Sequence, residues 1–285
     1  MTWTTVVPLL VLVATSIGVT LWSDRLHPRL ATWILTGLAA MAVVSVVAVL
    51  LVLTLPLAAS SSRLANIIGW CFDRTTTRDR RWLGSAAGLT LTIGAARSML
   101  AHRVHRSMVP IGDVPVLVLS SNKATAYAVP GGRGQVVVTS AMLDALNEEE
   151  RRAMFAHEQA HLALGHHRFI RFGDLCASLL PVLRPLSRRI THATERWADE
   201  VAADRIGSRS MVARAVALAG LASAGESPTP MTIATIGVPA RVQALLTPPS
   251  HDASPVVACV GGAALCAAMV ATQLHHLATL LSHLC

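Results

Sequence analysis

Residues 31–59 contain no charged side chain, and this run limits what the chain can fold into more than any other feature. A helix of that length is long enough to cross the ~30 Å hydrocarbon core of a bilayer with some tilt. Pro56 near its end is compatible with a local kink. The run therefore predicts a membrane-spanning helix.

Further apolar runs predict several membrane segments. Residues 3–22 are interpreted as a retained helix rather than a signal peptide, because a basic N-terminal region is missing and another span follows at once. Residues 83–100 form a weaker third candidate, since Arg97 interrupts the end, and residues 255–282 form a final span. Hydrophobic residues make up 53% of the chain and charged residues 14%, which is too apolar for an ordinary soluble domain.

Residues 101–254 have a globular composition. They lie between an N-terminal membrane region, residues 1–100, and a C-terminal transmembrane helix within residues 255–285. Short runs of β-branched and apolar residues predict three strands, at residues 114–119, 126–129 and 135–139, with a glycine-rich turn at 130–134. We therefore expect a mainly α membrane protein with a small β-sheet or hairpin.

Charge and cysteine content exclude two classes of site. The net charge is +8, but no basic stripe with interleaved aromatic residues is present, so nucleic acid is not expected as a direct partner. The positive-inside rule places the Arg-rich segment 60–82 in the cytoplasm, and the globular part with it if residues 83–100 do not span. Five scattered cysteines without a C-x-x-C pair argue against a disulfide framework and a thiolate metal site.

An H-E-x-x-H motif at residues 157–161 indicates metal chemistry. Residues four apart share one face of a helix, so His157 and His161 can bind one zinc ion. Glu158 can reach a water on that ion and take its proton. The motif therefore predicts a zinc-dependent hydrolase.

The residues around the motif predict the helix that it needs. Asn147 is a suitable N-cap, and Glu150 three residues later completes a capping box. Gly165 is a plausible stop, so we expect a helix over residues 148–164.

A catalytic zinc needs a third protein ligand and an open position for water. His167 stands where some H-E-x-x-H proteases have a third histidine, but those need glycine at position 164, and this chain has Leu164. Glu195 and Glu200 on a later helix are the alternatives; they lie about 140° apart round the helix, so both cannot face one metal. With Glu195 as ligand, Asp199 can accept a hydrogen bond from a ligand histidine.

The H-E-x-x-H motif, the G-H pair after it and the E-x-x-A-D sequence at 195–199 resemble membrane-embedded Glu-zincin metalloproteases. Two groups share this plan: the HtpX-type and CAAX-prenyl-type proteases, and the protease domain of BlaR/MecR-type antibiotic-sensing receptors. The short linker between the two motifs and the small residues before Gly207 are more similar to the BlaR/MecR-type group. This resemblance favours Glu195 over Glu200.

The resemblance implies a Glu-zincin-like metalloprotease domain flanked by transmembrane helices. Its site would consist of the base Glu158, the zinc ligands His157, His161 and Glu195, and Asp199 behind a ligand histidine. His192, Arg196 and Arg205 are candidates for stabilising the transition state. A peptide substrate would add to an edge strand from the 126–139 region.

The function implied is that of a zinc metalloendopeptidase. It would be a multi-pass protein of the cell membrane, with its active site facing the cytoplasm. A regulatory role is expected, such as cleavage of a transcriptional repressor. No penicillin-binding domain follows residue 255, so a covalent β-lactam sensor is not expected. The alternatives are an HtpX-like quality-control protease and a non-catalytic zinc-binding membrane receptor or scaffold.

Overall fold

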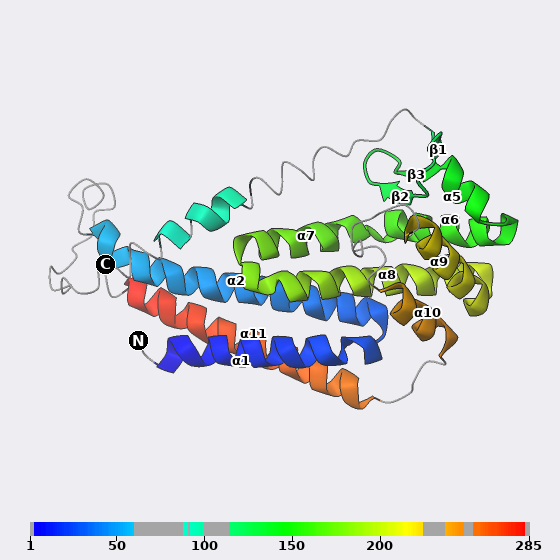
Figure 1. Ribbon diagram of the computed structural model, residues 1–285. Helices are drawn as coiled ribbons and strands as arrows, with labels where there is room; N and C mark the ends of the chain where they lie inside the picture. The colour runs from blue at the N-terminus through cyan, green and yellow to red at the C-terminus, as the bar shows by residue number, and fades with distance from the viewer. Residues whose placement is uncertain are drawn as a thin grey trace.

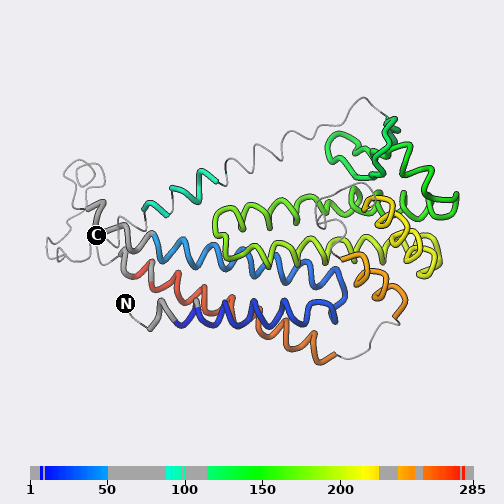
Figure 2. The backbone as a smooth tube through the Cα atoms, in the orientation of Figure 1, coloured from blue at the N-terminus to red at the C-terminus, as the bar shows by residue number. Residues whose placement is uncertain are grey.

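Three long apolar helices form one side of the molecule (Figure 1). The computed structural model describes residues 3–59, 88–90, 92–97, 99, 114–224, 237–247 and 253–282. The three helices are α1 (Trp3–Trp22), α2 (Pro28–Ala59) and α11 (Ser254–Ser282), and each packs against the other two. The chain enters α1 and leaves α11 at the same end of this bundle, far from the sheet (Figure 2).

Two of these helices are candidate membrane spans by length and composition. Among the described residues, they are Pro28–Leu50 in α2 and Ser254–His276 in α11. The first predicted span forms helix α1 but is not one of these two. Of the third predicted span, only residues 88–90, 92–97 and 99 are described, as helix, and the Arg-rich segment 60–82 lies outside the described residues.

The remaining elements run from the sheet to the C-terminal bundle helix. In chain order they are β1 (Val116–Leu119), β2 (Ala126–Val129), β3 (Gln135–Thr139), α5 (Ser140–Ala145), α6 (Glu148–Leu164), α7 (His166–Leu179), η3 (Pro181–Leu183), α8 (Arg184–Ile206), α9 (Arg209–Ala224) and α10 (Val238–Leu246), with η1 (Ser23–Arg25) joining α1 to α2. The arginine of the third predicted span, Arg97, donates from Nε to the carbonyl of Ser178 at 3.0 Å, so this segment lies against α7.

The small sheet has the order β1-β3-β2. The central strand β3 is parallel to β1 and antiparallel to β2, and every residue of β3 is buried. The turn before it contains Gly134, whose φ of 77° is unfavourable for other residues. In the described part of the chain β2 pairs on one side only, which leaves it an edge strand beside α6.

The sequence predicts a helix from about residue 192 to residue 206, and the observed helix α8 is longer. It begins at Arg184, not near residue 192, and Pro185 lies in its first turn. Proline is tolerated there because the first backbone N–H groups of a helix have no intrahelical acceptor. The prediction was wrong because Pro185 was interpreted as a break.

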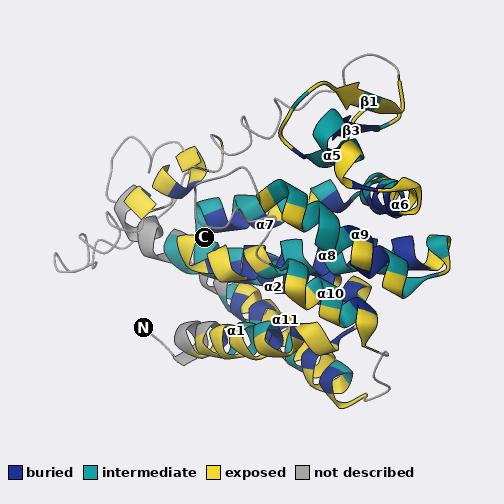
Figure 3. Ribbon diagram, turned by 45° about the vertical axis from the view of Figure 1, so that its right-hand side comes forward, coloured by how far each residue is buried: buried dark blue, intermediate teal, exposed yellow. Residues whose placement is uncertain are grey.

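Helix α8 shares its buried surface with the apolar bundle. One hydrophobic cluster includes Leu35 and Leu38 of α2 together with Leu186 and Ile190 of α8, all buried. Aromatic contacts extend it, since Trp33 of α2 meets Phe169 of α7 edge to face at 4.9 Å between ring centroids. Figure 3 shows buried residues where these helices meet and exposed ones on the outer turns of α1 and α11.

The opposite face of α8 packs within the sheet end of the molecule. A second cluster joins Ala202 of α8 to Ala153 of α6, Val212 of α9 and Leu245 of α10. A third lies between the sheet, α5, α6 and α9, with Val138 and Met142 in its centre. Helices α6 and α8 are therefore fixed against each other between the sheet and the bundle.

Candidate metal centre

Helix α6 begins and ends as its sequence predicts. The Asn147 side chain accepts from the Glu150 backbone N–H at 3.0 Å, and Glu150 accepts from the Asn147 N–H at 2.8 Å, which completes the capping box. Gly165 ends the helix in the left-handed conformation with φ 64°. The capping box and the glycine fix where α6 begins and ends, and with it the face that carries His157 and His161.

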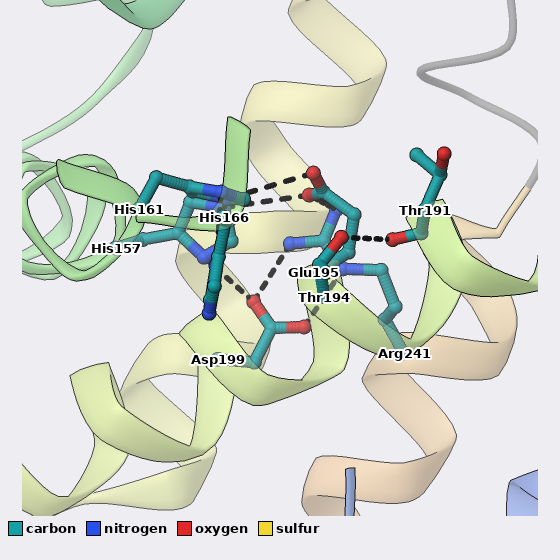
Figure 4. Close-up of polar contacts among 8 residues, drawn as sticks. All are labelled: His157, His161, His166, Thr191, Thr194, Glu195, Asp199 and Arg241. Atoms are coloured by element: carbon teal, nitrogen blue, oxygen red, sulfur yellow. Dashed lines mark hydrogen bonds and ion pairs between the residues drawn. The ribbon is translucent and has the colours of Figure 1, made fainter. Parts of the chain in front are cut away.

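The two histidines of the motif and Glu195 of α8 converge on one point (Figure 4). His157 Nε2 and His161 Nε2 are 3.1 Å apart, and the Glu195 carboxylate oxygens lie 3.4 Å and 3.5 Å from them. Their candidate ligand atoms all lie within 4.8 Å of one another. Two imidazole nitrogens and a carboxylate oxygen are a ligand set that catalytic zinc takes, with a fourth position left for water. The residues therefore fit zinc.

Asp199 and Arg241 support this group from behind. Asp199 lies one turn after Glu195 on α8, with Oδ1 2.9 Å from His157 Nδ1. Arg241 of α10 donates two hydrogen bonds of 2.7 Å to Asp199, and its Nη1 is 3.0 Å from Glu195. The carboxylate of Asp199 thus fixes the orientation of one ligand histidine, and the guanidinium fixes both carboxylates.

The charges of this group balance without a metal. Burial opposes ionisation of Asp199, but Arg241 outweighs it and lowers the pKa of Asp199 to about 2; the pKa of Glu195 is lowered for the same reason. Burial also opposes protonation of His157, yet the Asp199 and Glu195 carboxylates raise its pKa to about 10. At neutral pH two carboxylates therefore face two cations, Arg241 and protonated His157.

The general-base candidate has a different environment. Burial raises the pKa of Glu158 to about 7, against the opposing effect of His157 and a hydrogen bond from the Ala128 backbone. Burial lowers the pKa of His161 to about 4 and that of His166 to about 3, so both are neutral at pH 7. A carboxyl group whose pKa lies near the working pH is suited to taking and returning a proton.

A cavity of about 1170 Å³ opens onto this centre. His157, Glu158, His161 and Glu195 line it on one side. Residues 123–128, which include most of the edge strand β2, line it on another. An extended chain lying along β2 would therefore pass the metal centre.

The three candidates for transition-state stabilisation lie in different places. His192 lines the cavity one turn before Glu195, with Nε2 3.5 Å from Asp24 Oδ1. Arg196 is not a cavity residue, and its buried Nε has no hydrogen-bond partner among the described residues. Arg205 is exposed and does not line the cavity. Only His192 is placed to reach a bound substrate.

The two alternative third ligands lie outside the ligand group. Glu200 forms an ion pair with Arg209, with one contact at 2.9 Å. His167 lines the cavity, but its ring nitrogens are not among the converging ligand atoms. The geometry therefore favours Glu195.

Arg241 is a residue of this centre that the sequence did not predict. It lies in residues 226–254, whose proline, serine and threonine content predicts a loop region with a short helix. The sequence signal is weak: an arginine two residues after Pro239, in a short and mostly apolar segment, can also be a surface residue of a short helix. Its role depends on the packing of α10 against α8 and α9.

Comparison with known families agrees with the chemistry of this centre. Residues 95–174 match the model of peptidase family M48. The match contains the H-E-x-x-H motif and ends before Glu195, and it supports a zincin-type metallopeptidase. No curated protein and no solved structure matches the chain.

Proposed function

We propose that this protein is an integral membrane zinc metalloendopeptidase that hydrolyses peptide bonds of protein substrates. The observation that carries the proposal is the convergence of His157, His161 and Glu195 beside Glu158 on one cavity. The match to peptidase family M48 supports the same class of reaction.

Each residue has a role that its position supports. His157, His161 and Glu195 would hold zinc, which activates water and polarises the scissile carbonyl when it is bound. Glu158 takes the proton of the attacking water and returns it to the leaving amine. His192 is the best-placed group for stabilising the developing oxyanion, because it lines the cavity one turn from Glu195.

The substrate would bind as an added strand along β2. This strand is an edge strand in the described part of the chain, and it borders the cavity. Its Tyr127 is 40% exposed, so a side chain of β2 is open to a partner. Main-chain hydrogen bonds of this kind bind an extended peptide with little dependence on its sequence.

The proposal includes a location in the membrane and a regulatory role. Helices α2 and α11 are apolar enough to span. The family resemblance supports a cytoplasmic active site. The positive-inside rule does not support it, because residues 60–82 follow the C-terminal end of α2, whereas Arg29 near its N-terminal end lies over Trp197 beside the metal centre. The resemblance to BlaR/MecR-type protease domains supports cleavage of a defined substrate, such as a repressor. Cuts at many unrelated sites would instead support an HtpX-like quality-control protease.

The test compares three proteins purified in detergent: wild type, Glu158→Gln and the control Glu149→Gln. Glu149 is exposed in the first turn of α6. Zinc content and cleavage of an unstructured protein are measured for each. We expect zinc in all three and a loss of about 10²–10⁴ in rate for Glu158→Gln alone.

Two outcomes would contradict the proposal in different ways. Cleavage by Glu158→Gln at the wild-type rate would exclude this residue as the base. Zinc in all three proteins without cleavage by any would favour a non-catalytic zinc-binding receptor or scaffold.

A further inference from the structure

His166 is a fully buried histidine beside the metal centre. It follows Gly165, the left-handed stop of α6, and begins α7. The turn at Gly165 brings its side chain back against the end of α6, where its relative exposure is 0%. A histidine that is completely buried needs a partner for its ring nitrogens.

That partner is the ligand histidine His161. The two Nδ1 atoms are 3.1 Å apart, and the rings meet edge to face at 87° (Figure 4). A neutral imidazole has one nitrogen that donates and one that accepts. His161 Nε2 belongs to the ligand group, so its lone pair must face the metal and its proton must sit on Nδ1. His161 Nδ1–H therefore donates to His166 Nδ1.

This arrangement leaves one polar group of His166 unsatisfied. With Nδ1 as the acceptor, the proton of His166 lies on Nε2, which is buried and has no hydrogen-bond partner among the described residues. The Trp197 ring lies 4.8 Å away between centroids. A buried donor without an acceptor is unfavourable, and an apolar side chain of similar shape would avoid this cost. Packing alone therefore does not explain a histidine here.

We propose that His166 is a positioning residue that accepts the Nδ1 proton of His161 and holds its Nε2 toward zinc. His166 would do for His161 what Asp199 does for His157, with a neutral acceptor in place of an anionic one. The inference rests on the proposed zinc site. It does not depend on hydrolysis of any substrate.

Two substitutions of similar shape separate this role from packing. In His166→Asn the side-chain oxygen takes the place of Nδ1 as an acceptor, whereas His166→Leu has a methyl group there. Cys176→Ala, a small change at a buried position of the same helix, is the control for general destabilisation. Zinc affinity of each full-length protein in detergent is measured by competition with a chromogenic chelator, and zinc-free stability by urea unfolding.

We expect His166→Leu to bind zinc about 10–100-fold more weakly than wild type, as outer partners of metal ligands typically do when removed. His166→Asn and Cys176→Ala should bind close to wild type. Wild-type affinity in His166→Leu, or equal weakening in the leucine and asparagine variants, would overturn the inference.

A measurement on the wild type decides the case if His166→Leu does not fold. NMR of isotope-labelled histidine nitrogens in the zinc-loaded protein should show a proton on His161 Nδ1 and none on His166 Nδ1, and the reverse would overturn the inference. A wild type that binds zinc but cleaves nothing would contradict the proposed function alone. A wild type that binds no zinc would overturn both.

Discussion

Replacement of Arg241 tests the charge balance of the metal centre most directly. Its side chain is 11% exposed, and it contacts Asp199 at 2.7 Å twice and Glu195 at 3.0 Å. In Arg241→Leu both carboxylates remain, and one of the two positive charges that face them is removed. The zinc-free protein would then fold with an uncompensated buried negative charge.

The expected loss is about 3–5 kcal/mol of the unfolding free energy of the zinc-free protein, as for other buried pairs that lose one partner. In the wild type the Asp199 side chain is only 2% exposed, so water contributes little to its solvation. Protonated His157 remains 2.9 Å from Asp199 and keeps the loss within this range. An exposed ion pair would lose only about 0.2–1 kcal/mol.

Zinc is first removed with a chelator. Urea unfolding in detergent is then monitored by tryptophan fluorescence. Trp197, one of six tryptophans in the chain, is buried on α8 between Glu195 and Asp199, so the fluorescence change includes the unfolding of this helix. Arg152→Leu is the matched control, because it makes the same change in an exposed pair with Glu148. Added zinc should reduce the difference in unfolding free energy between Arg241→Leu and wild type, since it brings positive charge to the carboxylates.

One result would refute the reasoning about charge. If zinc-free Arg241→Leu were as stable as Arg152→Leu, the two carboxylates would not need the guanidinium in order to be buried. If added zinc increased the difference in unfolding free energy between Arg241→Leu and wild type, Arg241 would act mainly by placing the metal ligands rather than by balancing their charge.

Two further predictions concern pH and the bundle. The zinc-free protein should lose stability as pH rises from about 6.5 to about 10, because the folded state holds the His157 proton more tightly than the unfolded state. Urea unfolding midpoints measured across this pH range check this prediction. The loss of stability should be smaller in Asp199→Asn. A wild-type midpoint that does not change with pH would contradict the prediction. Ser45→Ala should cost about 0.6 kcal/mol, since Ser45 donates to Gln273 across α2 and α11 at 2.6 Å. The same unfolding assay measures it, and an unchanged midpoint would exclude a contribution from this bond.

Local signals made helix α6 predictable. Asn147, Glu150 and Gly165 act within one or two turns, so the sequence alone determines where the helix begins and ends and which face carries the motif. The three short strands were also predictable from their β-branched runs. Their order was not, because the parallel pairing of β1 with β3 skips β2 and depends on contacts distant in sequence.

Of the supporting residues of the metal centre, Asp199 was predictable from its spacing with Glu195, whereas Arg241 and the contact of His166 were not. Arg241 reaches Asp199 only because α10 packs against α8 and α9. The contact of His166 with His161 depends on the direction in which Gly165 turns the chain, and sequence spacing alone does not give that direction. Spacing within one helix indicates the ligands and Asp199, whereas Arg241 and His166 reach this group only through the way the helices pack and the chain turns.

The shared core of α2 and α8 has a mechanical consequence. Glu195 sits on a helix whose other face is buried against α2, and Arg29 of α2 lies over the Trp197 ring at 5.9 Å. If α2 spans the bilayer as proposed, a change in bilayer thickness that tilts α2 moves the helix that carries Glu195, with no flexible loop between them. The lipid environment would then change the geometry of the metal centre directly, and the protein in vesicles of different acyl-chain length would have different zinc affinities.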